Sequence, residues 1–176
     1  MIFSYKNLYA LSALLFFAYP GTFEQRAIAL PSLTQQQINP VFKPILPKLK
    51  QKSQIKLLLP KYIPESNTEN PLYAIIETAT KNKYEILLGF SPDCSGGTAC
   101  RLGLLTAEKV NKQTPRLTGK AVLLAKGITG YFVDFQCGAN CSDATLTWRY
   151  QGIQYTIGLK AGSRNELIKM ANSAIK

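Results

Sequence analysis

The residues Tyr131–Lys160, YFVDFQCGANCSDATLTWRYQGIQYTIGLK, contain a β-hairpin whose register follows from the sequence. Gln151 and Gly152 make a two-residue loop of the kind that joins antiparallel strands. The residue numbers of the two partners in every cross-strand pair therefore add up to the same total. This pairs Trp148 with Tyr155 on a face that is apolar along both strands. A shift of one residue would place these two rings on opposite faces, so the pattern specifies the pairing.

The two faces of this hairpin predict two roles. We interpret Trp148 and Tyr155 as core residues that contact a helix, because large aromatic side chains on an apolar face are usually buried. The polar face is the possible ligand face, and its residues are Arg149, Thr147, Thr156 and Gln154. An exposed Trp148 with a buried Arg149 would mean that the sheet is inside out.

The C-terminal residues change from a period of two to a helical period. Ser163 and Glu166 have the spacing of a capping box, and the apolar residues that follow fall on one helical face. This predicts one amphipathic helix. We expect it to cover a sheet, with a position on a membrane surface as the alternative.

Further strands are expected at residues 55–60, 72–80, 84–90, from Arg101, and at 120–125 and 131–136, joined as a meander. The prediction is an α+β fold, in which a twisted antiparallel sheet of about six or seven strands packs against one C-terminal helix. Residues 55–176 are expected to form this single domain.

The residues before this domain predict export. Residues 1–29 have one lysine, a short apolar run and a small-x-small cleavage pattern that ends at Ala29, as in a signal peptide. An uncleaved membrane anchor is the alternative. Residues 30–54 are rich in proline and lysine and lack a clear period, which predicts an extended, polyproline-like linker. The apolar residues of this linker, such as Phe42, could lie on the core.

The four cysteines come as two close pairs, and export favours disulfides over metal or redox chemistry. Three connectivities are open. A long bridge such as Cys94 to Cys137 would stabilise the fold by about 4 kcal/mol, against about 2 kcal/mol for each local bridge. Proximity nevertheless favours Cys94 with Cys100 and Cys137 with Cys141, because each pair flanks a glycine-containing loop between strands.

The formal net charge is +11 for the whole chain. A basic exported protein tends to adhere to anionic membrane or cell-wall surfaces, and we expect no nucleic-acid partner. The lysines expected to make such a contact lie in the linker and are Lys43, Lys48, Lys50 and Lys52. The alternative is that the charge affects solubility only.

The chain has no histidine, which excludes Ser-His-Asp and Cys-His catalytic arrangements and every metal site that needs histidine. The cysteine spacings match neither zinc knuckles nor the C-x-x-C redox motif. Asp93, Asp134 and Asp143 lie beside the cysteine loops, where a lone acid is usually a local hydrogen-bond acceptor. We therefore predict no catalytic residue, metal or cofactor.

The motifs GYF, CGANCS, W-x-x-x-G-x-x-Y (Trp148, Gly152, Tyr155) and ELIKMANSAI, with LP and PLYA segments near Leu59 and Pro71, resemble a group of small exported cyanobacterial proteins without assigned activity. The C-terminal motifs are also similar to an uncharacterised extracytoplasmic domain of bacterial membrane and anti-sigma-associated proteins. The resemblance implies an extracytoplasmic location, and it carries over no catalytic residue because none is assigned in these proteins.

The sequence as a whole predicts an exported, non-enzymatic binding or accessory domain of the cell envelope with an unknown ligand. A carboxylate-based envelope hydrolase is one alternative. Adhesion of the basic linker to an anionic membrane or cell-wall surface is the other.

Overall fold

The computed structural model describes residues 38–64, 71–95, 99–138 and 141–176. These residues belong to one compact unit, Gln36–Lys176. The expected signal peptide, residues 1–29, belongs to the unit Met1–Gln35, which lies outside the described residues. Within the described ranges, no helix combines the length and the apolar character that crossing a bilayer would require.

Seven strands of the described chain form one antiparallel sheet, which confirms the predicted α+β fold. In chain order they are β1 (Tyr73–Thr80), β2 (Lys83–Gly89), β3 (Arg101–Lys109), β4 (Lys120–Leu123), β5 (Thr129–Val133), β6 (Asp143–Tyr150) and β7 (Ile153–Lys160). Their order in the sheet is β1-β2-β3-β7-β6-β5-β4.

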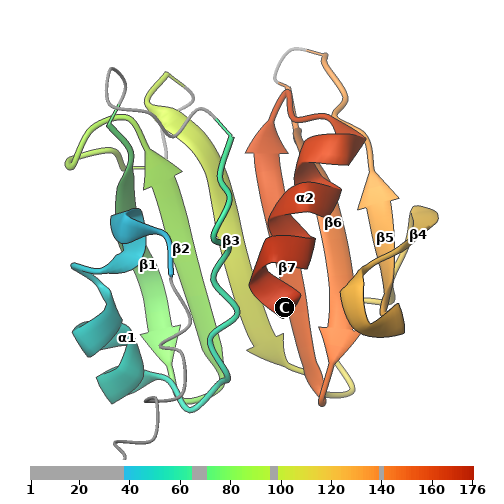
Figure 1. Ribbon diagram of the computed structural model, residues 1–176, viewed down its shortest axis with the longest axis horizontal. Helices are drawn as coiled ribbons and strands as arrows, with labels where there is room; N and C mark the ends of the chain where they lie inside the picture. The colour runs from blue at the N-terminus through green and yellow to red at the C-terminus, as the bar shows by residue number, and fades with distance from the viewer. Residues whose placement is uncertain (1–37, 65–70, 96–98, 139–140) are drawn as a thin grey trace, which may run out of the picture. The chain divides into compact units, whose positions relative to one another are not determined.

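This strand order corrects the expectation of one meander. The sheet consists of two meanders, β1 to β3 and β4 to β7, which meet where β3 pairs with β7 (Figure 1). The polar connection of residues 110–119 carries the chain from the middle of the sheet to its far edge. Length does not distinguish this connection, because residues 90–100 and 134–142 join strands that pair with each other. Those two connections are each bridged by a disulfide, whereas residues 110–119 contain no cysteine.

The hairpin of β6 and β7 has the predicted register throughout, from Asp143 with Lys160 to Tyr150 with Ile153. Gln151 and Gly152 have φ values of 51° and 74°, which are the positive values that a type I′ turn needs at both positions. The rings of Trp148 and Tyr155 stack with centroids 5.6 Å apart, and Trp148 is 1% exposed.

The C-terminal helix α2 (Arg164–Ile175) packs on β6 and β7, as Figure 1 shows. Its capping box is formed in both directions, because the Ser163 side chain accepts from the Glu166 amide and the Glu166 side chain accepts from the Ser163 amide. Leu167, Met170 and Ala171 are fully buried against the sheet. The predicted capped amphipathic helix on a sheet is confirmed.

The expectation of an extended linker is wrong for the part of residues 30–54 that the structure describes. Residues 40–42 form the 3-10 helix η1 (Pro40–Phe42), and α1 (Leu46–Lys52) is an α-helix with proline in its first turn. Phe42 and Leu49 are 0% exposed within the core. A helix forms because Ile45 and Leu49 are four residues apart and because proline is tolerated at a helix start.

The strand expected at residues 55–60 is absent, and these residues instead continue across the apolar face of the sheet. The Tyr155 hydroxyl donates to the carbonyl of Lys56 at 3.0 Å, so this segment covers β7 beside α2. Farther along, the amides of Lys61 and Tyr62 donate to Ser173 Oγ of α2 at 3.0 and 3.1 Å. We call residues 38–64 together with residues 161–176 the covering layer.

Candidate functional site

The face of the sheet opposite the covering layer, which we call the open face, carries the predicted ligand residues. Trp148 is buried and Arg149 is exposed, so the sheet has the predicted orientation. The hydroxyls of Thr147 and Thr156 lie 3.0 Å apart across β6 and β7. Arg149 Nε donates to Gln154 Oε1 at 3.0 Å, which leaves Gln154 only 9% exposed.

Two of these four residues, Gln154 and Thr156, line a hollow, and Arg149 contacts the connection between β3 and β4. Arg149 Nη2 donates to the carbonyl of Pro115 at 2.8 Å, so the connection between β3 and β4 passes over Arg149. This contact fixes the guanidinium as a support for the connection. Gln154 and Thr156, on the same face, line a hollow of about 160 Å³ on β2, β3 and β7.

The hollow is lined by two short rows of side chains that run across three strands. One row holds Lys83, Glu108 and Gln154, and the other holds Glu85, Thr106 and Thr156. Neighbouring strands lie about 4.8 Å apart, so each row presents three polar groups within roughly 10 Å. The volume is below the roughly 300–1,000 Å³ of typical ligand pockets. It suits one small polar group.

The charges in the hollow sum to one negative charge. Lys83 Nζ lies 3.1 Å from Glu85 Oε2, and these side chains are 44% and 25% exposed. Among the residues that the structure describes, Glu108 has no ion-pair partner. The free carboxylate, two threonine hydroxyls and an amide favour a ligand rich in hydrogen-bond donors, such as a hydroxylated or amine-bearing group.

Glu85 and Glu108 were missed by the sequence analysis. The available signal was the alternation of polar and apolar residues around them, which assigns each to the polar face of its own strand. Only the register of β2 with β3 brings them together as diagonal neighbours, at a Cβ separation of about 7–8 Å or less.

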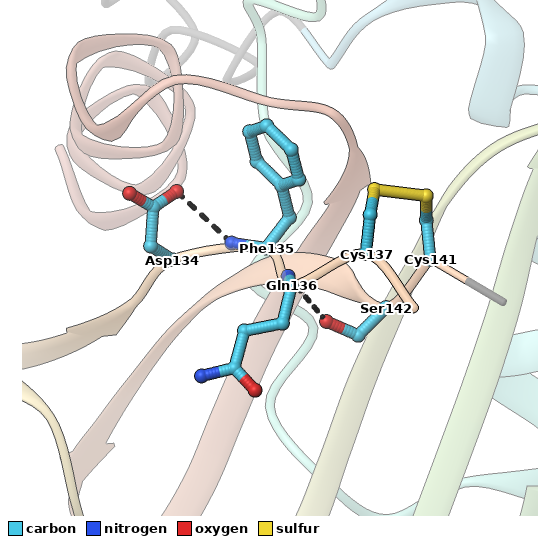
Figure 2. The surroundings of a disulfide bond; sticks show 6 residues. All are labelled: Asp134, Phe135, Gln136, Cys137, Cys141 and Ser142. Atoms are coloured by element: carbon cyan, nitrogen blue, oxygen red, sulfur yellow. Dashed lines mark hydrogen bonds between the residues drawn. A yellow bond between two sulfur atoms is a disulfide. The ribbon is translucent and has the colours of Figure 1, made fainter. Parts of the chain in front are cut away.

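The acids singled out beside the cysteine loops do not line the hollow. Asp93 accepts from Ser91 Oγ at 2.7 Å, and this hydrogen bond lowers the pKa of the Asp93 carboxyl. Asp134 accepts from the amide of Phe135 at 2.9 Å (Figure 2). Both are local hydrogen-bond acceptors, as predicted.

Asp143 has a structural contact of longer range. Its Oδ1 lies 2.8 Å from Arg101 Nη2, so the pair links β6 to β3 across β7. The strand between them carries Gly158 at this point, and a Cβ there would meet Asp143 Oδ2 at 3.2 Å. The absence of a side chain at Gly158 gives the carboxylate room to span the strand.

The four cysteines form the two local bridges, Cys94 with Cys100 and Cys137 with Cys141, as predicted. They close the loops from β2 to β3 and from β5 to β6, at the same end of the sheet. Beside the second bridge, the backbone N–H of Gln136 donates to Ser142 Oγ at 3.0 Å (Figure 2). The two disulfides indicate an oxidising, non-cytoplasmic compartment.

Tyrosines near the hairpin have structural contacts. Burial, and secondarily the charge of Tyr150, raises the pKa of Tyr155 to about 12. Lys56 Nζ lies 5.3 Å from the ring centroid of Tyr150. Tyr131 of β5 pairs with Thr147 of β6 and does not line the hollow. The aromatic residues therefore support the fold around the open face.

Among the described residues, no group of three or more acids and cysteines has the arrangement of a metal site. Comparison with known proteins found no matching family model, curated protein or solved structure. The resemblance to exported cyanobacterial proteins and to the extracytoplasmic domain therefore stays a prediction.

Proposed function

We propose that this protein is an exported, non-enzymatic binding or accessory domain of the cell envelope, and that the hollow on its open face binds a small polar group. The observation that carries the proposal is the set of six convergent polar side chains on three rigid, central strands. Side chains held by a sheet present their donors and acceptors with little loss of conformational entropy on binding.

The chemistry of the hollow indicates the class of ligand. Glu85 is already paired with Lys83, so Glu108 is the carboxylate left to accept from a ligand. Thr106 and Thr156 can both donate and accept, which suits neighbouring hydroxyls. An amino sugar of an envelope glycan has this combination of an ammonium group and hydroxyls.

The experiment is a titration of the ¹⁵N-labelled protein with glucosamine, followed by amide chemical shifts. We expect changes confined to β2, β3 and β7, and weaker changes with neutral N-acetylglucosamine. Glu108→Gln should lower the affinity for glucosamine about tenfold or more, because a charge-assisted hydrogen bond contributes roughly 1.5–3 kcal/mol.

The matched control is Glu77→Gln, which removes an exposed carboxylate from the edge strand β1, outside the hollow. It should leave the affinity unchanged. If neither sugar shifts the amides of β2, β3 and β7, or if both variants weaken binding equally, the hollow is not the binding site.

One observation favours a second candidate, a carboxylate-based envelope hydrolase. Glu85 and Glu108 line the same hollow, and their diagonal positions are compatible with the roughly 6.5–9.5 Å between the carboxyl groups of inverting glycosidases. Turnover of a glycan, peptide or ester substrate that is lost in Glu108→Gln and kept in Glu77→Gln would favour this candidate over the binding domain.

A further inference from the structure

The covering layer carries most of the net positive charge of the described chain. Residues 38–64 contain six lysines, with no acid and no arginine. Residues 161–176 add Arg164, Lys169 and Lys176 against the single acid Glu166. The described residues outside the layer hold ten cations and six acids, so charge is far more balanced there.

All nine cationic side chains of the layer are exposed. The apolar residues between them, such as Leu49, point into the core and fix the backbone that carries the charges. Lys169 Nζ lies 3.8 Å from the centroid of the Tyr62 ring, a contact that orders the ammonium without neutralising it. Within the described ranges, no ion pair is formed by Lys43, Lys48, Lys50 or Lys52.

The two parts of the layer are joined into one surface. Ser173 Oγ accepts from the amides of Lys61 and Tyr62 and donates to the carbonyl of Met170 at 2.7 Å. This side chain links the N-terminal segment to α2, and Figure 1 shows both on the same side of the sheet. The lysines thus belong to a fixed face of the domain, in place of the extended linker expected from the sequence.

We propose that the covering layer docks on a lipid bilayer with anionic headgroups, with the open face and its hollow directed away from the membrane. The cations are spread over α1, the 53–64 segment, α2 and the flanking residues Lys43 and Lys176, which matches a plane of charge better than a single strand of polymer. Lysine is a point charge without the bidentate geometry of arginine, so it suits a diffuse anionic surface.

The docking is electrostatic without insertion of apolar side chains. The exposed large hydrophobic residues of the described chain all lie outside the layer, and they are Tyr73, Phe90, Leu123, Val133 and Phe135. Binding should therefore weaken steeply as salt is added, because exposed charges are screened over about 10 Å at 0.1 M ionic strength.

The test is co-sedimentation of the full chain with vesicles of phosphatidylcholine, with and without phosphatidylglycerol, over a range of salt concentrations. Binding through the apolar residues near the N-terminus would occur on both vesicles, so the difference between them isolates the electrostatic part. K48Q/K50Q removes two exposed charges from α1 and should weaken binding to the anionic vesicles roughly thirtyfold at low salt.

The matched control is K112Q/R116Q, which removes two exposed charges from the connection on the open-face side. It should change binding by about twofold or less, and unfolding curves should show that both variants fold. Glu108→Gln should leave vesicle binding unchanged, which separates this proposal from ligand binding in the hollow. The same loss in both double variants, loss in neither, binding insensitive to salt, or retention on a soluble polyanion without vesicle binding would overturn the proposal.

Discussion

Leu49→Ala tests whether the lysine-rich N-terminal segment is part of the folded core. Leu49 is 0% exposed, and the substitution removes three carbon atoms at about 0.8 kcal/mol each, or about 2.4 kcal/mol of transfer free energy. The cavity left behind adds to this, so the expected loss in free energy of unfolding is about 3 kcal/mol within a range of about 2–5 kcal/mol.

The measurement is urea unfolding with the disulfides intact. With a slope of about 2 kcal/mol/M, a loss of about 3 kcal/mol lowers the midpoint by about 1.5 M. Lys50→Ala is the control, because it changes the next residue of the same helix on an exposed position and should shift stability by about 0.5 kcal/mol or less. If Leu49→Ala also costs under about 0.5 kcal/mol, the segment does not contribute to the core.

Three further predictions concern contacts that close the fold. Tyr155→Phe removes the donor to the Lys56 carbonyl and should lower the free energy of unfolding by about 1–2 kcal/mol. The pKa of Tyr155 is about 12 in the folded protein against the ordinary 10.0, so wild-type stability should fall as pH rises above about 10, and it should fall less in the variant. Equal pH dependence of the two stabilities would contradict this. Ser163→Ala removes the helix cap and should lower the free energy of unfolding, measured by thermal unfolding, by about 1 kcal/mol. Hydrogen bonds from Ser163 lower the pKa of Glu166, so the contribution of Glu166 to stability is present above its ordinary pKa of 4.5 and is lost as pH falls below it. A stability difference between wild type and Glu166→Gln that stays constant down to a pH of about 2 would refute this. Replacing Cys94 and Cys100 by serine should cost about 2 kcal/mol, and a cost near 4 kcal/mol would indicate a longer loop than the local bridge closes.

The hairpin of β6 and β7 was predictable because its information is local. A two-residue loop and strict alternation specify every pair, and the rings of Trp148 and Tyr155 exclude the neighbouring registers. The helix α2 was predictable for the same reason, since the capping box and the apolar face are contained in one short segment.

The order of the strands was not predictable from such signals. The pairing of β3 with β7 joins segments that are far apart along the chain, and neither strand differs in composition from one that pairs with its sequential neighbour. The hollow depends on this pairing, because Gln154 and Thr156 meet Glu108 and Thr106 only across it. A ligand face could be predicted from the hairpin, whereas its carboxylates could not.

The helix α1 was missed for another reason. Pro44 and Pro47 and the alternating lysines suggest an extended chain, and a single apolar residue, Leu49, carries most of the evidence for the helix. A helix of this length is unstable alone and depends on packing that the sequence pattern does not reveal.

The pairing of β3 with β7 also has a consequence for how the chain folds. The other strand pairs are hairpins or short-range contacts, whereas this pair closes a loop of roughly 44 residues from Lys109 to Ile153, at an entropic cost of about 3 kcal/mol. Each meander could therefore form early, and their union is expected to limit the folding rate. Trp148, the single tryptophan of the chain, stacks on Tyr155, which bonds to Lys56 of the first half. The fluorescence of Trp148 should therefore report when the two meanders join during folding.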